Sequence, residues 1–113
     1  MVQKEKADFS CFAGLDMRVG RVLEVAPAAT RKPTYRLRVD FGPDVGVRTS
    51  CGAFVNYAKE QLTGKLVIGV LNLGSRRMGG EVSEVLILGV PGRDGATIVL
   101  TPESDVEPGV AVF

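Results

Sequence analysis

The stretch Tyr35-Arg-Leu-Arg-Val-Asp-Phe41 gives the clearest strand pattern in this chain of 113 residues. Its four odd-numbered residues are apolar, and they alternate with Arg36, Arg38 and Asp40. Strict alternation of apolar and charged residues is typical of a strand that has one face buried and the other in solvent. The stretch therefore predicts a β protein with its core on one side of this strand and two arginines on the other.

The residues before this stretch predict a long, bent first strand. Met17 to Val25 is rich in apolar residues, but the apolar positions change phase after Gly20. A glycine at a phase change indicates a β-bulge, which lets one strand bend around the corner of a barrel. The two prolines of residues 27–33 mark that segment as the loop between the first and second strands.

The residues after the stretch predict its partner strand. Residues 42–44, Gly-Pro-Asp, form a turn that leads into a third strand. In that strand we expect Val47 and Thr49 to face the core. Arg48 and Ser50 would then face outward, on the same side as the arginines of the second strand.

The remaining pattern defines the fold class. Residues 53–62 have apolar residues at helical spacing and are followed by Gly64, a favoured residue after a helix. The apolar runs 65–71 and 84–90 predict buried strands, and residues 97–100 predict a shorter one. This order describes an all-β, five-stranded OB-fold barrel with a short helix between strands 3 and 4. A β-sandwich fits the number of strands but leaves the helix without a role, so we favour the barrel.

Composition restricts the class of protein further. The length corresponds to one domain, residues 1–113, with short extensions at about 1–14 and 101–113. The chain has no histidine, and Cys11 and Cys51 are too far apart for a paired redox or zinc motif. We therefore expect a protein that is not an enzyme, with no catalytic residues, metal site or cofactor. No secretory signal or bilayer-length apolar run is present, which predicts a cytoplasmic protein.

Half of the fourteen basic residues would gather on one side of such a barrel. An OB barrel binds ligands across the outer face of strands 2 and 3, between the loops that join strands 1 and 2 and strands 4 and 5. The basic residues at those places are Arg31, Lys32, Arg36, Arg38, Arg48, Arg76 and Arg77. Guanidinium groups suit phosphate because they offer paired donors and keep their charge. The alternative is that these residues only keep the surface soluble, although solubility does not require them to cluster.

Met78 is the second feature of the segment at residues 72–84. It stands beside Gly79 and Gly80, where a flexible thioether would pack against a nucleotide or an unfolded peptide. The alternative is that Met78 folds back over the mouth of the barrel. The segment carries no base, nucleophile or metal ligand, so the chain is expected to bind a ligand rather than convert it.

Several motifs together resemble one known family. They are Leu15–Gly20, Leu37–Gly42, Arg48–Gly52, Asn72–Leu73, Arg76–Met78 and Ser83–Glu84. On these motifs the chain resembles the tRNA-binding domain family, which includes EMAP II-type cytokine precursors and domains appended to some methionyl- and phenylalanyl-tRNA synthetases. Within the family it is most similar to the export-related chaperones of the CsaA type, which share Ser-Glu-Val-Leu after the arginine pair. The tRNA-binding members usually have Gly-Met at the positions of Val85 and Leu86.

The resemblance implies a homodimeric chaperone. Such a protein would hold non-native or export-bound polypeptides on an apolar, arginine-bearing surface that includes Met78. The alternative it implies is a protein that binds tRNA or structured RNA, either free-standing or docked on a synthetase. A homodimer also has a reason in the residues, because a small barrel cannot easily bury apolar chain ends by itself. The predicted interface residues are Phe9, Phe12, Val110, Val112 and Phe113.

Overall fold

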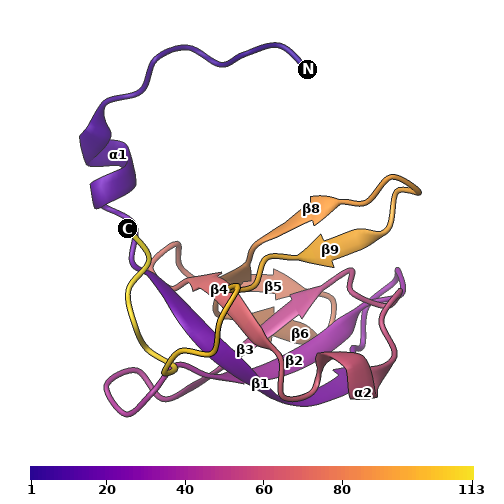
Figure 1. Ribbon diagram of the computed structural model, residues 1–113. Coiled ribbons are helices and arrows are strands. Elements are labelled where there is room, and N and C mark those ends of the chain that lie inside the picture. The colour runs from indigo at the N-terminus through magenta and orange to yellow at the C-terminus, as the bar shows by residue number, and fades with distance from the viewer.

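Five antiparallel strands form the main sheet of the computed structural model, which describes residues 1–113 (Figure 1). The strands are β1 (Met17–Pro27), β2 (Tyr35–Asp40), β3 (Val47–Gly52), β4 (Leu66–Val70) and β7 (Leu86–Ile87). They lie in the order β3-β2-β1-β4-β7. The sheet curls until β3 meets the segment before β7, where the Glu84 N–H donates to the Thr49 carbonyl at 2.8 Å. The predicted five-stranded OB-type barrel is confirmed.

Two short helices and two hairpins complete the chain. Helix α2 (Lys59–Leu62) lies between β3 and β4, as predicted, and helix α1 (Phe9–Ala13) projects from the barrel (Figure 1). Neither helix has the length and apolar character needed to cross a membrane. The hairpins pair β5 (Arg76–Met78) with β6 (Glu81–Ser83), and β8 (Gly89–Pro91) with β9 (Thr97–Val99).

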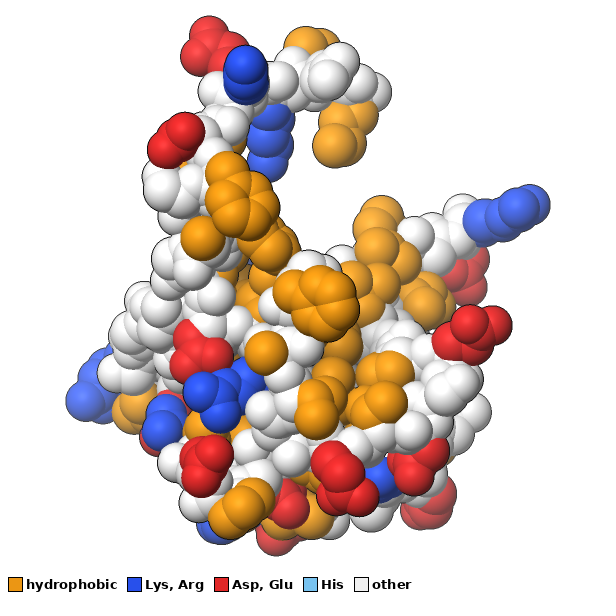
Figure 2. Space-filling model, turned by 60° about the vertical axis from the view of Figure 1, so that its left-hand side comes forward, with side chains coloured by type: hydrophobic (Ala, Val, Ile, Leu, Met, Phe, Trp, Pro, Cys, Tyr) orange, Lys and Arg blue, Asp and Glu red, His pale blue; other side chains and the backbone are white.

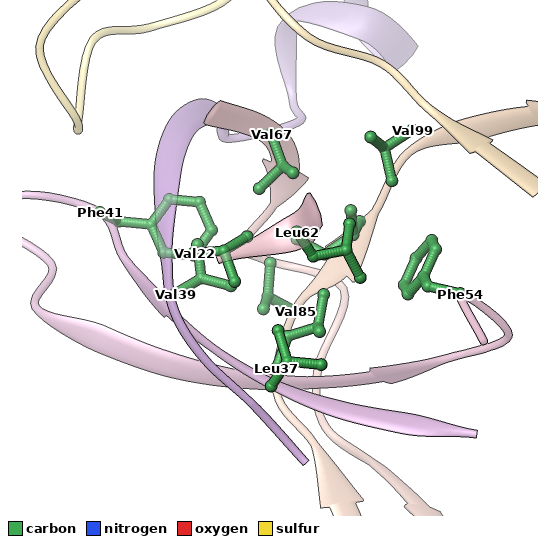
Figure 3. Packing of buried hydrophobic residues seen from close by; sticks show 11 residues of the cluster. Val22, Leu37, Val39, Phe41, Phe54, Leu62, Val67, Val85 and Val99 are labelled. Atoms are coloured by element: carbon green, nitrogen blue, oxygen red, sulfur yellow. The ribbon is translucent and has the colours of Figure 1, made fainter. Parts of the chain in front are cut away.

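The barrel interior is filled by one cluster of aliphatic side chains around Phe41 and Leu37 (Figure 3). The alternation in β2 is confirmed, because these two residues are fully buried. A methyl group added to Gly20 would lie 2.7 Å from the Phe41 ring. Gly20 therefore makes room for Phe41, and our prediction of a bulge at Gly20 is wrong in position. The register of β1 against β2 shifts between Val22 and Glu24 instead.

The faces of β3 are the reverse of our prediction. Arg48 pairs with Val39, and Ser50 pairs with Leu37. Directly paired residues share a face, so Ser50 points into the barrel and is only 2% exposed. The physical reason is the turn, which extends to Gly46 (φ 82°) rather than ending at residue 44. A shift of one residue moves every side chain of a strand to the opposite face.

Three other segments differ from the sequence pattern. The helix covers only residues 59–62, because residues 53–58 form turns in which the Tyr57 N–H donates to the Phe54 carbonyl at 3.0 Å. The predicted strand at 84–90 is divided into β7 and β8. The connection at residues 72–84 is not an open loop, since it folds into the hairpin β5–β6.

The C-terminal tail pairs with the first half of β1. The Val19 N–H donates to the Val110 carbonyl at 3.0 Å, and the Gly109 N–H donates to the Val19 carbonyl at 2.7 Å. The Val112 N–H donates to the Met17 carbonyl at 2.9 Å. The backbone of the tail is therefore part of the barrel.

Candidate nucleic-acid interface

The hairpin β5–β6 carries the arginine pair singled out in the sequence. Its register pairs Arg77 with Val82 and Met78 with Glu81. Glu81 is buried against the barrel, whereas Arg77 and Val82 are exposed. Because paired residues share a face, Arg77 and Val82 lie on the solvent side of the hairpin.

The tip of this hairpin docks on the loop between β1 and β2. The Gly80 N–H donates to the Ala29 carbonyl at 3.1 Å, and the Ala29 N–H donates to Glu81 Oε1 at 3.1 Å. A methyl group added to Gly79 would lie 2.8 Å from the Ala29 oxygen, so the two backbones are in close contact. The loop that carries Arg31 and Lys32 is therefore held against the hairpin that carries Arg76 and Arg77.

The seven basic residues of the sequence analysis fall into two groups. Five are exposed: Arg31, Lys32, Arg38, Arg76 and Arg77. The other two, Arg36 and Arg48, are half-buried in a hollow that Glu81 and Glu84 also line. Arg36 Nη1 forms an ion pair with Glu81 Oε1 at 2.8 Å, so its charge is partly offset. The fold thus brings two basic segments together, but the ion pair with Glu81 lowers the positive charge that Arg36 adds to this surface.

Glu81 is the residue that the sequence analysis missed. It contacts the loop through Ala29 and the open face of β2 through Arg36. The signal available in the sequence was a single carboxylate directly after the glycine pair in an otherwise basic segment. Nothing in the pattern showed that this carboxylate would be buried.

An apolar cavity of about 470 Å³ lies beside the basic segments. It is bordered by the end of β3, the hairpin β5–β6 and the hairpin β8–β9 and is open on one side. Half of its eighteen lining residues are hydrophobic, among them Phe54, Met78, Leu86 and Val90, and Arg76 stands among the polar ones. Met78 is half-buried in this wall, so it is less accessible than a loop tip would make it.

Cys51 also lines the cavity and is buried. Burial raises the pKa of its thiol, and the negative charge of Glu81 raises it further, whereas Arg36 acts in the opposite direction. A raised pKa leaves less of the reactive thiolate at neutral pH. Cys51 therefore fits a role in packing rather than in chemistry.

The two ends of the chain carry apolar side chains that are mostly exposed. Phe9, Phe12, Val110 and Phe113 are exposed, and Val112 is half-buried. Figure 2 shows apolar side chains on the projecting N-terminal segment, on the neighbouring barrel surface and toward the hairpin β8–β9. No contact within the chain covers this surface fully.

The barrel, its docked hairpin and its exposed basic residues define a class of protein. Residues 17–111 match the family model described as "Putative tRNA binding domain". The chain belongs to this family of tRNA-binding domains.

Its curated relatives include the methionine–tRNA ligases of Archaeoglobus fulgidus and Parabacteroides distasonis, each 38% identical to it. The first match covers 99% of this chain and 17% of the ligase, and the second covers 96% and 16%. The chain therefore corresponds to about one sixth of the length of these ligases.

Solved structures of similar proteins span the whole barrel. The CsaA chaperone from Picrophilus torridus is 34% identical with a TM-score of 0.90, and the chaperone CsaA from Bacillus anthracis is 31% identical with a TM-score of 0.89. Both matches cover 96% of this chain and 100% of the other chain. A methionyl-tRNA synthetase-related protein from Pyrococcus horikoshii, 27% identical, has a TM-score of 0.84 and is matched over 97% of this chain and 100% of its own.

Proposed function

We propose that this chain binds tRNA, or structured RNA of similar shape, through phosphate contacts from its exposed basic residues. The observation that carries the proposal is the docking of the β5–β6 tip on the β1–β2 loop. This contact brings the loop that carries Arg31 and Lys32 against the hairpin that carries Arg76 and Arg77. Membership of the tRNA-binding domain family and the similarity to methionine–tRNA ligases support it. In this proposal the domain binds RNA in the cytoplasm and does not convert it.

The proposed recognition depends on the RNA backbone rather than on stacked bases. The Tyr35 hydroxyl donates to the Tyr57 carbonyl at 2.9 Å, and the Tyr57 hydroxyl accepts from the Val99 N–H at 3.2 Å. Both tyrosines are thus engaged within the fold. Proteins that bind single strands usually offer exposed aromatic platforms, whereas folded RNA is recognised largely by shape and phosphates.

The test is the salt dependence of tRNA binding. Four phosphate contacts predict a log–log slope of binding constant against salt of roughly −3 to −4. The double variant R76A/R77A should reduce the slope by about one to two, since each contact contributes a little under one. The matched control is K4A/K6A, which removes two charges from the projecting N-terminal segment (Figure 1) and should leave the slope unchanged. Absence of binding by the wild-type chain at low salt would overturn the proposal.

A second candidate function is the holding of non-native or export-bound polypeptides, which the sequence analysis ranked first. It is supported by the apolar cavity of about 470 Å³ and by the similarity to the two CsaA chaperones. Met78→Asp places a charge in the cavity wall and should abolish suppression of client aggregation. Val82→Asp is the control, because Val82 is 43% exposed on the opposite face of the same hairpin. Equal activity of both variants and wild type would exclude the cavity as the client site.

We also propose that the apolar chain ends form a homodimer interface. Removal of residues 108–113 would be a poor test, because it also removes the tail's hydrogen bonds to β1. Phe9→Ser and Phe113→Ser change only exposed side chains and leave that pairing intact. Sedimentation should show a dimer for wild type and a 12.0 kDa monomer for the double variant. A wild-type chain that sediments only as the monomer at micromolar concentration would contradict this interface.

A further inference from the structure

Glu81 is an acidic residue buried beneath a basic surface. Only 10% of its side-chain surface is exposed. A carboxylate at this depth is costly to desolvate unless charged groups and hydrogen-bond donors surround it. Its Oε1 atom accepts from Arg36 Nη1 at 2.8 Å and from the Ala29 N–H at 3.1 Å. One oxygen atom thus connects the hairpin, the open face of β2 and the β1–β2 loop.

The loop has few other links to the rest of the molecule near its basic residues. Its internal bonds run from the Ala28 N–H to the Thr34 carbonyl at 2.9 Å and from the Thr30 hydroxyl to the Lys32 carbonyl at 2.7 Å. These bonds shape the loop but do not attach it to the hairpin. That attachment depends on Ala29, whose N–H and carbonyl both bond to residues of the hairpin.

We infer that Glu81 is a positioning residue for RNA binding, which fastens the β1–β2 loop to the hairpin so that both basic segments form one preformed surface. This inference rests on the proposed RNA-binding function. Holding the loop in its bound position before RNA arrives lowers the ordering cost of binding. Without Glu81, the Ala29 N–H and the Arg36 guanidinium lose their partner, and only the bond from the Gly80 N–H to the Ala29 carbonyl still attaches the loop to the hairpin. Arg31 and Lys32 are then held less firmly relative to Arg76 and Arg77.

A positioning role for Glu81 and its negative charge predict opposite effects on RNA affinity when the residue is removed. Removing a negative charge beside phosphate-binding residues should tighten RNA binding if charge alone matters. Removing a residue that positions the basic segments should weaken binding despite that gain in positive charge. Glu84 supplies the comparison, because it lines the same hollow but contacts the Thr49 N–H at 3.0 Å and not the loop.

The experiment measures the tRNA dissociation constant and its salt slope for E81A, E81Q and E84A at about 0.1 M salt. We expect E81A to weaken binding about five- to twenty-fold, with E84A equal to wild type or tighter. E81Q should fall between wild type and E81A, because its amide oxygen can still accept from the Ala29 N–H. Urea unfolding establishes whether each variant is folded. If E81A does not fold, the comparison of E81Q with wild type and E84A is the test.

A second measurement separates positioning from a general loss of structure. Arg31→Ala should weaken binding less in the E81A background than in wild type, because the loop is then held less firmly against the hairpin. If the effects of Arg31→Ala and E81A on the free energy of RNA binding simply add, the inference is overturned. E81A binding as tightly as E84A would also overturn it while leaving RNA binding intact, whereas failure of wild type to bind tRNA would overturn the proposed function itself.

Discussion

The two hairpins of this barrel have strands of equal length, three residues each, but they are attached to the barrel differently. In β5–β6 the tip is fixed, because Gly79 and Gly80 contact Ala29 and the neighbouring Glu81 is buried. In β8–β9 the turn at residues 92–96 is free, although strand β9 is held at both of its ends. The side-chain amide of Asn56 exchanges two hydrogen bonds with the backbone of Thr97, at 2.9 and 3.3 Å, directly after the turn. At the base, the Val99 N–H donates to the Tyr57 hydroxyl at 3.2 Å. A methyl group added to Gly95 would have no neighbour within 4 Å.

This difference separates two kinds of surface. The docked hairpin presents charged side chains in a fixed arrangement, which suits recognition of a ligand with regularly placed charges. The free hairpin exposes Val90 and Ile98, which pair across its strands. Exposed apolar pairs suit contact with another apolar surface.

The largest effect is expected from breaking the docked tip. Gly79→Ala places an L residue at φ 61° and drives its methyl group against the Ala29 oxygen, so we expect a loss of about 2–4 kcal/mol in unfolding free energy. Gly95→Ala has a similar positive φ of 86° but open space, so only the backbone cost of about 1–2 kcal/mol should remain. Urea unfolding of both variants measures the difference. Equal losses would mean that the docking contact does not stabilise the fold.

The second effect is expected at the start of β9, where the strand leaves the free turn. Asn56→Ala removes both hydrogen bonds to Thr97 and should cost about 1–2 kcal/mol of local stability. Amide hydrogen exchange should become faster in β8–β9, while the protection of β5–β6 remains as in wild type. Faster exchange in both hairpins would show that they open together rather than separately.

A smaller effect should distinguish the two hairpins in tRNA binding. Arg77→Ala on the docked hairpin should reduce the salt slope of tRNA binding by about one, whereas Arg93→Ala at the free tip should leave it unchanged. Each variant removes one exposed arginine, so total charge changes equally. A slope that falls in both variants would extend the RNA-binding surface to the free hairpin.

The smallest effect concerns Cys51, which lines the cavity between the hairpins. Because the folded state raises the pKa of this thiol, the folded state binds the proton more tightly than the unfolded chain does. Stability should therefore fall slightly as pH rises above the unfolded pKa of the thiol. In a Cys11→Ser background, reaction of Cys51 with a thiol reagent should be slow at pH 8 and fast after unfolding. Rapid reaction of the folded chain would show that the cavity opens readily.

The sequence predicted burial well in segments with strict apolar periodicity. It predicted burial poorly where the geometry of a turn or a distant contact determines which way a side chain points. The alternation around Leu37 and Val39 reports burial directly, so β2 and the barrel could be predicted. The faces of β3 depend on a turn that continues to Gly46, and no apolar pattern encodes that length. Glu81 resembles any exposed acidic residue in the sequence. Its burial results from contacts with Ala29 and Arg36, which are 52 and 45 positions away in the chain.

The hydrogen bond between the Val112 N–H and the Met17 carbonyl has a consequence for chain connectivity. The barrel begins and ends at the same place, so a short linker would suffice to join its two ends. Domains of this kind tolerate circular permutation and insertion into other chains. The free tip at Gly95 is then the natural place for new termini, because opening the chain there leaves the five-stranded sheet and the docked hairpin unbroken.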